Sequence, residues 1–146
     1  MSHTPAITID NLNMQYGDAT ILDSVSCNIP AGQWVSIVGP SGCGKSTLLR
    51  CVAGLTNPTT GMVQLEGKQP AFVFQDPTLL PWRSAAGNIQ LPLELEEPSN
   101  ESWSDRVLQV AQLVGLEDAD IDKYPRELSG GMRMRVSIAR ALVMNP

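Results

Sequence analysis

The most specific chemistry in this sequence lies in a glycine-rich run of nine residues, Gly39-Pro40-Ser41-Gly42-Cys43-Gly44-Lys45-Ser46-Thr47. The run matches the phosphate-binding loop pattern G-x-x-x-x-G-K-[ST]. Glycines let the backbone adopt positive φ and approach a bulky anion, so that successive N–H groups point at phosphate oxygens. Lys45 would add a mobile charge for β- and γ-phosphates, and the Ser46 hydroxyl would ligate Mg²⁺. The run therefore predicts a site for a nucleotide and a magnesium ion.

Such a loop must be held between a strand and a helix. The apolar segment Gln33–Val38 predicts a buried strand that ends at Gly39. Residues 46–53 predict a helix, with Gly54 as its C-terminal cap. The start of this helix would offer free N–H donors and the positive end of its dipole to the phosphates.

Turn residues and hydrophobic periodicity predict the other elements of the chain. Strands are expected at residues 6–16, 20–29, 62–65 and 71–74. Helices are expected at residues 84–95 and from Trp103 to about Val114. Ser102 and Asp105 have the spacing of a capping box before the second of these helices, and Gly115 suits its C-terminal cap.

The segment from Gly130 to Met144 carries two conflicting patterns. Residues 132–138 alternate apolar and polar side chains with a period of two, as a strand does. The whole segment is too long for a typical strand, and Ser129 is well placed to cap a helix. We therefore predict one helix over residues 130–144.

Composition limits the classes of protein that this chain can belong to. The 146 residues suit one ordinary domain, and the net charge of −5 argues against non-specific binding to nucleic acid. No apolar run approaches the roughly 18 residues that a membrane span needs. The three cysteines form no C-x-x-C pair, which suits reduced thiols in the cytosol.

Three further motifs resemble those of ATP-binding cassette (ABC) proteins. Leu128-Ser129-Gly130-Gly131-Met132 resembles the LSGGQ signature, with Met132 where glutamine is commonest, and the following residues resemble the signature helix. Phe74-Gln75-Asp76 resembles the family's Q-loop, and Tyr16 stands where the family places an aromatic residue that stacks on adenine. The segment Phe72–Trp82, together with Met132, resembles ATPase subunits of bacterial importers for nitrate, sulfonate or taurine.

The resemblance implies a fold and a shared site. The fold would be α/β, with a P-loop NTPase core, an antiparallel β subdomain and a helical subdomain inserted at about residues 84–135. In the family, two subunits associate head to tail, so that Ser129, Gly130 and Gly131 of one would cover ATP on the phosphate-binding loop of the other. Gln75 would ligate Mg²⁺ and orient water, and Lys45 and Gln75 would be the catalytic residues.

The same resemblance implies partners and a location. The chain would pair with a second copy and with transmembrane permease subunits at the inner face of the cell membrane, and it would not bind nucleic acid. The family's Walker B element, an apolar strand that ends in Asp-Glu, is not recognised here, and His3 is the only histidine. We therefore expect a partial nucleotide-binding domain that binds ATP and Mg²⁺ but hydrolyses ATP poorly.

Several alternatives remain open at this point. The chain could instead be a non-transport ABC ATPase or a non-enzymatic nucleotide-binding fragment. Tyr16 could stack on adenine or fill a strand face. Leu79, Leu80 and Trp82 could contact a membrane subunit or cover the local core. Arginines on the predicted signature helix are expected to form surface salt bridges, namely Arg133, Arg135 and Arg140.

Overall fold

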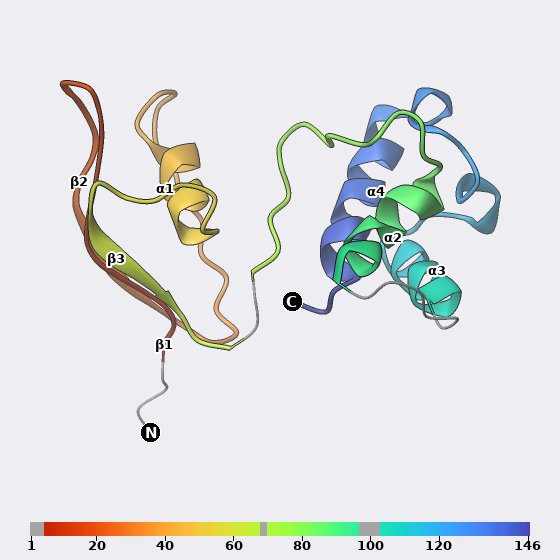
Figure 1. Cartoon of the computed structure of the whole chain (residues 1–146), viewed down its shortest axis with the longest axis horizontal. Coiled ribbons are helices and arrows are strands. Elements are labelled where there is room, and N and C mark those ends of the chain that lie inside the picture. Colours follow the sequence, from red (N-terminus) through yellow and green to blue (C-terminus); the bar gives the residue numbers. More distant parts are fainter. Residues whose placement is uncertain (1–4, 68–69, 97–102) are drawn as a thin grey trace. The chain divides into compact units, whose positions relative to one another are not determined.

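The computed structural model describes residues 5–67, 70–96 and 103–146, which fall into two compact units, residues 1–70 and 71–146. Among the described residues, the first unit contains strands β1 to β3 and helix α1, and the second contains helices α2 to α4 (Figure 1). None of the helices in these ranges is both long and apolar enough to cross a lipid bilayer.

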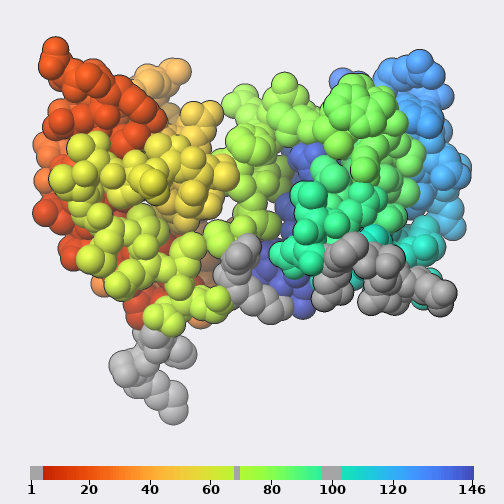
Figure 2. Space-filling view, viewed as in Figure 1, coloured from red at the N-terminus to blue at the C-terminus, as the bar shows by residue number. Residues whose placement is uncertain are grey.

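The first unit is built on a three-stranded antiparallel sheet in the order β2-β1-β3. Strands β1 (Pro5–Tyr16), β2 (Ala19–Pro30) and β3 (Thr60–Leu65) lie where the sequence predicted strands. In the space-filling view the yellow atoms of β3 lie along the red and orange atoms of the other two strands (Figure 2). Gly17, with φ 58°, lies in the tight turn between β1 and β2.

Helix α1 (Lys45–Val52) completes the core of the first unit. Buried residues of the sheet and of α1 form one cluster, namely Ile9, Leu12, Met14, Leu22 and Cys51. The helix ends as predicted, because Gly54 adopts φ 70° and its N–H donates to the carbonyl of Cys51 at 3.1 Å. The N–H of Leu55 donates to the carbonyl of Arg50 at 2.9 Å, which completes a Schellman motif.

Two predicted strands are not formed. Residues 33–38 and 71–74 have irregular backbone, and the side chains of Trp34 and Val38 are 99% and 89% exposed. A strand forms only where a neighbouring segment supplies a ladder of hydrogen bonds. Within the described ranges no strand pairs with either segment, so the prediction of a buried strand before Gly39 and of a strand before Gln75 is wrong for this structure.

The second unit is a helical cluster whose three α-helices all contact one another. Helices α2 (Ala85–Glu96), α3 (Trp103–Leu113) and α4 (Gly130–Leu142) confirm the three helices predicted there. Two short 3₁₀ turns connect α3 to α4, η1 (Asp118–Asp120) and η2 (Pro125–Glu127).

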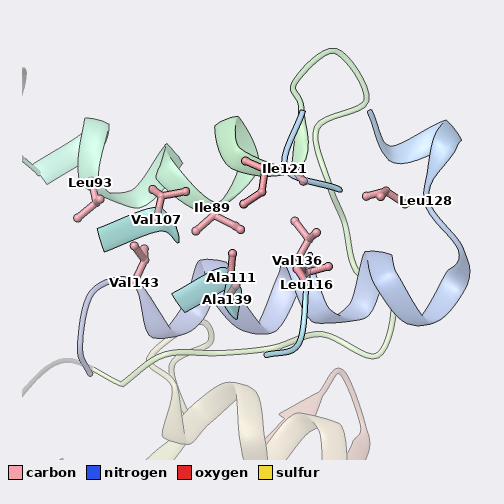
Figure 3. Close-up of a cluster of buried hydrophobic side chains, with 11 residues drawn as sticks. Ile89, Leu93, Val107, Ala111, Leu116, Ile121, Leu128, Val136, Ala139 and Val143 are labelled. Atoms are coloured by element: carbon pink, nitrogen blue, oxygen red, sulfur yellow. The ribbon is translucent and has the colours of Figure 1, made fainter. Parts of the chain in front are cut away.

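Apolar side chains from all three helices point toward one another in the core of the second unit (Figure 3). Ile89 of α2, Ala111 of α3 and Val136 and Ala139 of α4 are all fully buried. Val107, one turn before Ala111, is also buried, as the periodicity of α3 predicted. The cluster fixes α4 against the other two helices.

Backbone conformation and hydrogen bonds at the helix ends test the caps that the sequence predicted for α3 and α4. Gly115 adopts φ 76° and its N–H donates to the carbonyl of Gln112 at 2.9 Å, which confirms the C-terminal cap of α3. Ser102, half of the predicted capping box, lies outside the described residues. At the start of α4, Ser129 Oγ accepts a hydrogen bond from the N–H of Met132 at 3.2 Å, which confirms the helix over the strand pattern.

Candidate nucleotide-binding site

The phosphate-binding loop takes its shape from two glycines in the left-handed region. Gly42 has φ 82° and Gly44, which caps α1, has φ 93°. A Cβ atom added at Gly44 would lie 2.9 Å from the carbonyl oxygen of Ile21 and 2.9 Å from Cδ2 of Leu22. The loop therefore rests directly on β2 at Gly44, and only glycine allows that close approach.

The ammonium group of Lys45 lies against the same loop. Lys45 Nζ donates to the carbonyl oxygens of Gly39 and Pro40 at 2.9 Å and 2.6 Å, and it lies 3.6 Å from Cys43 Sγ. The next residue, Ser46, is exposed. Helix α1 has no acidic residue in its first turn, so nothing there offsets the positive end of its dipole. The start of α1 therefore presents backbone N–H donors, the Lys45 ammonium and the Ser46 hydroxyl.

The start of α4 offers a second set of donors. Ser129, Gly130 and Gly131 are all exposed, and α4 also has no acidic residue in its first turn. The first N–H groups of a helix have no partner within the helix, so those of both glycines face outward at the positive end of α4. No atom lies within 4 Å of where a Cβ of Gly131 would be. This turn therefore offers exposed donors of the kind that bind anions at helix starts.

The structure corrects the prediction of salt bridges for the arginines of α4. Arg133 Nη1 donates to the carbonyl of Leu128 at 2.9 Å, and Arg135 Nη1 donates to that of Gly115 at 2.8 Å. Arg140 likewise binds backbone carbonyls, and burial lowers the pKa of its guanidinium from the usual value. Guanidinium groups carry five donors, which suits them to carbonyls at helix ends and turns that lack backbone partners.

Gln75 lies in an exposed bend, and the segment that follows it is held by a residue that the sequence analysis missed. Asn88 of α2 is fully buried, and its Oδ1 accepts from the N–H of Leu80 at 2.7 Å. Its Nδ2 donates to the carbonyls of Leu80, Arg83 and Ser84 at 3.1, 3.1 and 3.0 Å. The sequence carries no clear signal for this role, because Asn88 is one of four polar residues in α2, with Gln90, Glu94 and Glu96.

The exposure of individual side chains bears on the alternatives that the sequence left open for Tyr16 and for the segment 79–82. Leu79 packs against the helical core, whereas Trp82 is 70% exposed. Tyr16, at the end of β1, is 54% exposed and does not fill the face of the strand. Of the predicted site residues, the first unit contains Tyr16 and the loop 39–47, and the second contains Gln75 and the turn 129–131.

Comparison with known proteins places this geometry in a family. The family model described as ABC transporter matches residues 22–146. The aliphatic sulfonates import ATP-binding protein SsuB of Bacillus subtilis is 41% identical over 134 residues, covering 87% of this chain and 51% of that protein. The methionine import ATP-binding protein MetN 1 of Salmonella typhimurium is 44% identical over 149 residues, covering 90% of this chain and 43% of that protein.

The fold is also that of a solved ATP-binding cassette. A dimeric cassette in a post-hydrolysis state, bound to ADP and Pi, superposes with a TM-score of 0.86 at 34% identity, covering 96% of this chain and 70% of that one. This likeness confirms the predicted P-loop NTPase fold. The chain spans about half the length of the curated relatives it matches. With the matched family model and the nine-residue loop, these likenesses show that the chain belongs to the ABC transporter family.

Proposed function

We propose that this chain is the nucleotide-binding part of an ABC importer's ATP-binding subunit, which couples ATP binding and hydrolysis to solute uptake. The observation that carries the proposal is the Lys45 ammonium, which lies 2.9 Å and 2.6 Å from loop carbonyls at the uncompensated start of α1. The similarity to SsuB and MetN 1 supports an importer. We propose a solute of the nitrate, sulfonate or taurine kind.

In this proposal the phosphates of ATP replace the loop carbonyls as acceptors for Lys45. The N–H groups of residues 41–47, at the start of α1, bind the same phosphates, and the exposed ring of Tyr16 stacks on adenine. A water-activating carboxylate is not among the residues predicted for this site, so we expect the 146-residue chain to hydrolyse ATP inefficiently.

We propose that Ser46 and Gln75 supply the protein ligands of Mg²⁺. Among the described residues no group of three His, Cys, Asp or Glu side chains could hold a metal ion by itself. Ser46 and Gln75 present a hydroxyl and an amide oxygen, and Mg²⁺ is commonly bound by one or two protein oxygens together with substrate phosphates and water. When bound, the ion would neutralise charge on the β- and γ-phosphates.

We further propose that ATP is shared between two copies of the chain. Ser129, Gly130 and Gly131 of a second copy would cover the γ-phosphate, and the dimeric arrangement of the solved cassette supports this.

Permease subunits at the inner face of the membrane would be the other partners, and nucleic acid would not be one. Residues 1–146 would then form a partial nucleotide-binding domain, with a helical subdomain at about residues 84–135.

Equilibrium unfolding with and without MgATP tests the proposed function. A ligand that binds only the native state stabilises it by about 2.7 kcal/mol when its concentration is 100 times its dissociation constant. We therefore expect the urea midpoint to rise steadily with MgATP concentration, and to rise less with MgAMP, which lacks the β- and γ-phosphates. Identical midpoints with and without MgATP would contradict the proposal.

Gly131→Asp tests the role of the second copy. The position is open, and an acidic residue in the first turn of a helix is favourable, so we expect α4 to be as stable as before or slightly more stable. The new carboxylate would repel the γ-phosphate of ATP bound to the other copy. Sedimentation velocity is expected to show loss of ATP-driven dimers, while each monomer still binds ATP.

Gly131→Ala is the matched control, because it adds the same Cβ at the same open position without charge. It is expected to dimerise with ATP as the unmodified chain does. If Gly131→Asp and Gly131→Ala dimerised equally well, the turn 129–131 would not contact the nucleotide.

A further inference from the structure

The segment after Gln75 has irregular backbone but is attached firmly to helix α4. Arg140 Nη2 donates to the carbonyl of Pro77 at 3.0 Å, and Nη1 donates to the carbonyl of Thr78 at 3.1 Å. A third contact joins Arg140 Nη2 to Thr78 Oγ1 at 3.3 Å. One guanidinium therefore fixes two consecutive peptide groups that lie 62 and 63 residues away in the chain.

Asn88 attaches the same segment to helix α2. Its four hydrogen bonds reach the backbone of Leu80, Arg83 and Ser84, and its side chain is fully buried. Arg140 and Asn88 together bind the backbone at both ends of residues 77–84. Because α2 and α4 share one hydrophobic core, this segment and both helices form one body.

Thr78 shows that the surrounding contacts impose the path of this segment. It adopts φ 46°, in the left-handed region, which β-branched residues rarely enter. Such a conformation persists where neighbouring contacts over-determine it. The two contacts from Arg140 to Thr78 supply that constraint.

We propose that Arg140 is a positioning residue for Gln75. This inference rests on the proposed function, in which the Gln75 amide oxygen ligates Mg²⁺ on ATP. Gln75 lies two residues before Pro77, so at most about 7 Å of chain separates the two. Arg140 thereby ties the position of Gln75 to α4, the helix that Ser129 caps. The magnesium ligand and the turn 129–131 move together.

The test measures ATP binding to the chain at a series of Mg²⁺ concentrations. Arg140→Gln is expected to leave the affinity for ATP in EDTA unchanged. The Mg²⁺ concentration that gives half of the magnesium-dependent gain in affinity is expected to rise about tenfold, as is typical when a group that orients a metal ligand is removed. Hydrogen exchange of peptides covering residues 76–83 is expected to accelerate in the same variant.

A double-variant cycle separates positioning from general stability. In a Gln75→Ala background, Arg140→Gln is expected to produce no further shift in Mg²⁺ dependence, because the ligand that it positions is gone. Arg135→Gln is the matched control, since that guanidinium donates to the carbonyl of Gly115 at 2.8 Å from the same helix. It should retain the unmodified Mg²⁺ dependence.

Arg140→Lys keeps the charge and the aliphatic stem but cannot bind both carbonyls in the same geometry. It is expected to give an intermediate shift, and it supplies the comparison if Arg140→Gln does not fold. Unmodified Mg²⁺ dependence in the folded Arg140 variant, with ATP still bound, would overturn this inference alone. Failure of the unmodified chain to bind ATP at any Mg²⁺ concentration would overturn the proposed function, and this inference with it.

Discussion

Gly44→Ala is expected to abolish measurable ATP binding and to lower the free energy of unfolding of the first unit. The residue has φ 93°, and the new Cβ would lie 2.9 Å from both the carbonyl oxygen of Ile21 and Cδ2 of Leu22. The left-handed conformation costs about 1–2 kcal/mol for alanine, and forcing extra volume into packed surroundings costs about 1–3 kcal/mol more. The start of α1 would have to move off β2, and the phosphate-binding loop would move with it.

Gly42→Ala is the control for this prediction. Gly42 lies in the same loop with φ 82°, but no atom lies within 4 Å of its added Cβ. It should therefore cost only the conformational part, about 1–2 kcal/mol. Urea unfolding followed by circular dichroism and titration with a fluorescent ATP analogue measure the two effects. Equal losses in both variants would show that contact between Gly44 and β2 does not shape the loop.

Lys45→Ala is expected to weaken ATP binding by about 10- to 100-fold, since hydrogen bonds to charged groups contribute about 1.5–3 kcal/mol each. The loss should concern the β- and γ-phosphates, so affinity for AMP should change little. Stability should also change little, because the bonds from Lys45 to Gly39 and Pro40 lie at an exposed part of the loop. Isothermal titration with ATP and AMP measures both affinities.

Arg50→Ala is the matched control for Lys45→Ala. It removes one positive charge from the exposed end of the same helix, away from the phosphate-binding loop. Its affinity for ATP is expected to equal that of the unmodified chain. If Lys45→Ala and Arg50→Ala bound ATP equally well, the lysine would not contact the phosphates.

Features encoded in a few neighbouring residues could be predicted from the sequence. Gly54 and Gly115 end α1 and α3 because each adopts a left-handed conformation that glycine tolerates best. Ser129 caps α4 through a bond that spans three residues. The length of residues 130–144 and this cap outweighed the alternating pattern. Two polar positions of that pattern, Arg133 and Arg135, donate to the carbonyls of Leu128 and Gly115.

Features that depend on distant partners could not be predicted in the same way. Residues 33–38 and 71–74 have the apolar composition of strands, but a strand also needs a hydrogen-bonded neighbour, and the described residues supply none for them. The bonds of Arg140 to Pro77 and Thr78 join residues more than 60 positions apart. The sequence does not reveal these bonds because their acceptors are peptide carbonyls, which every residue type carries.

The length of helix α4 determines how far a small rotation at one end displaces residues at the other end. Ser129 and Arg140 stand at opposite ends of it, about 16 Å apart along the axis at 1.5 Å per residue. A tilt of about 10° around the Ser129 end would carry the Arg140 end through about 3 Å, the length of one hydrogen bond. Because α4 and residues 77–84 form one body, such a tilt would carry the backbone beside Gln75 through about the same distance.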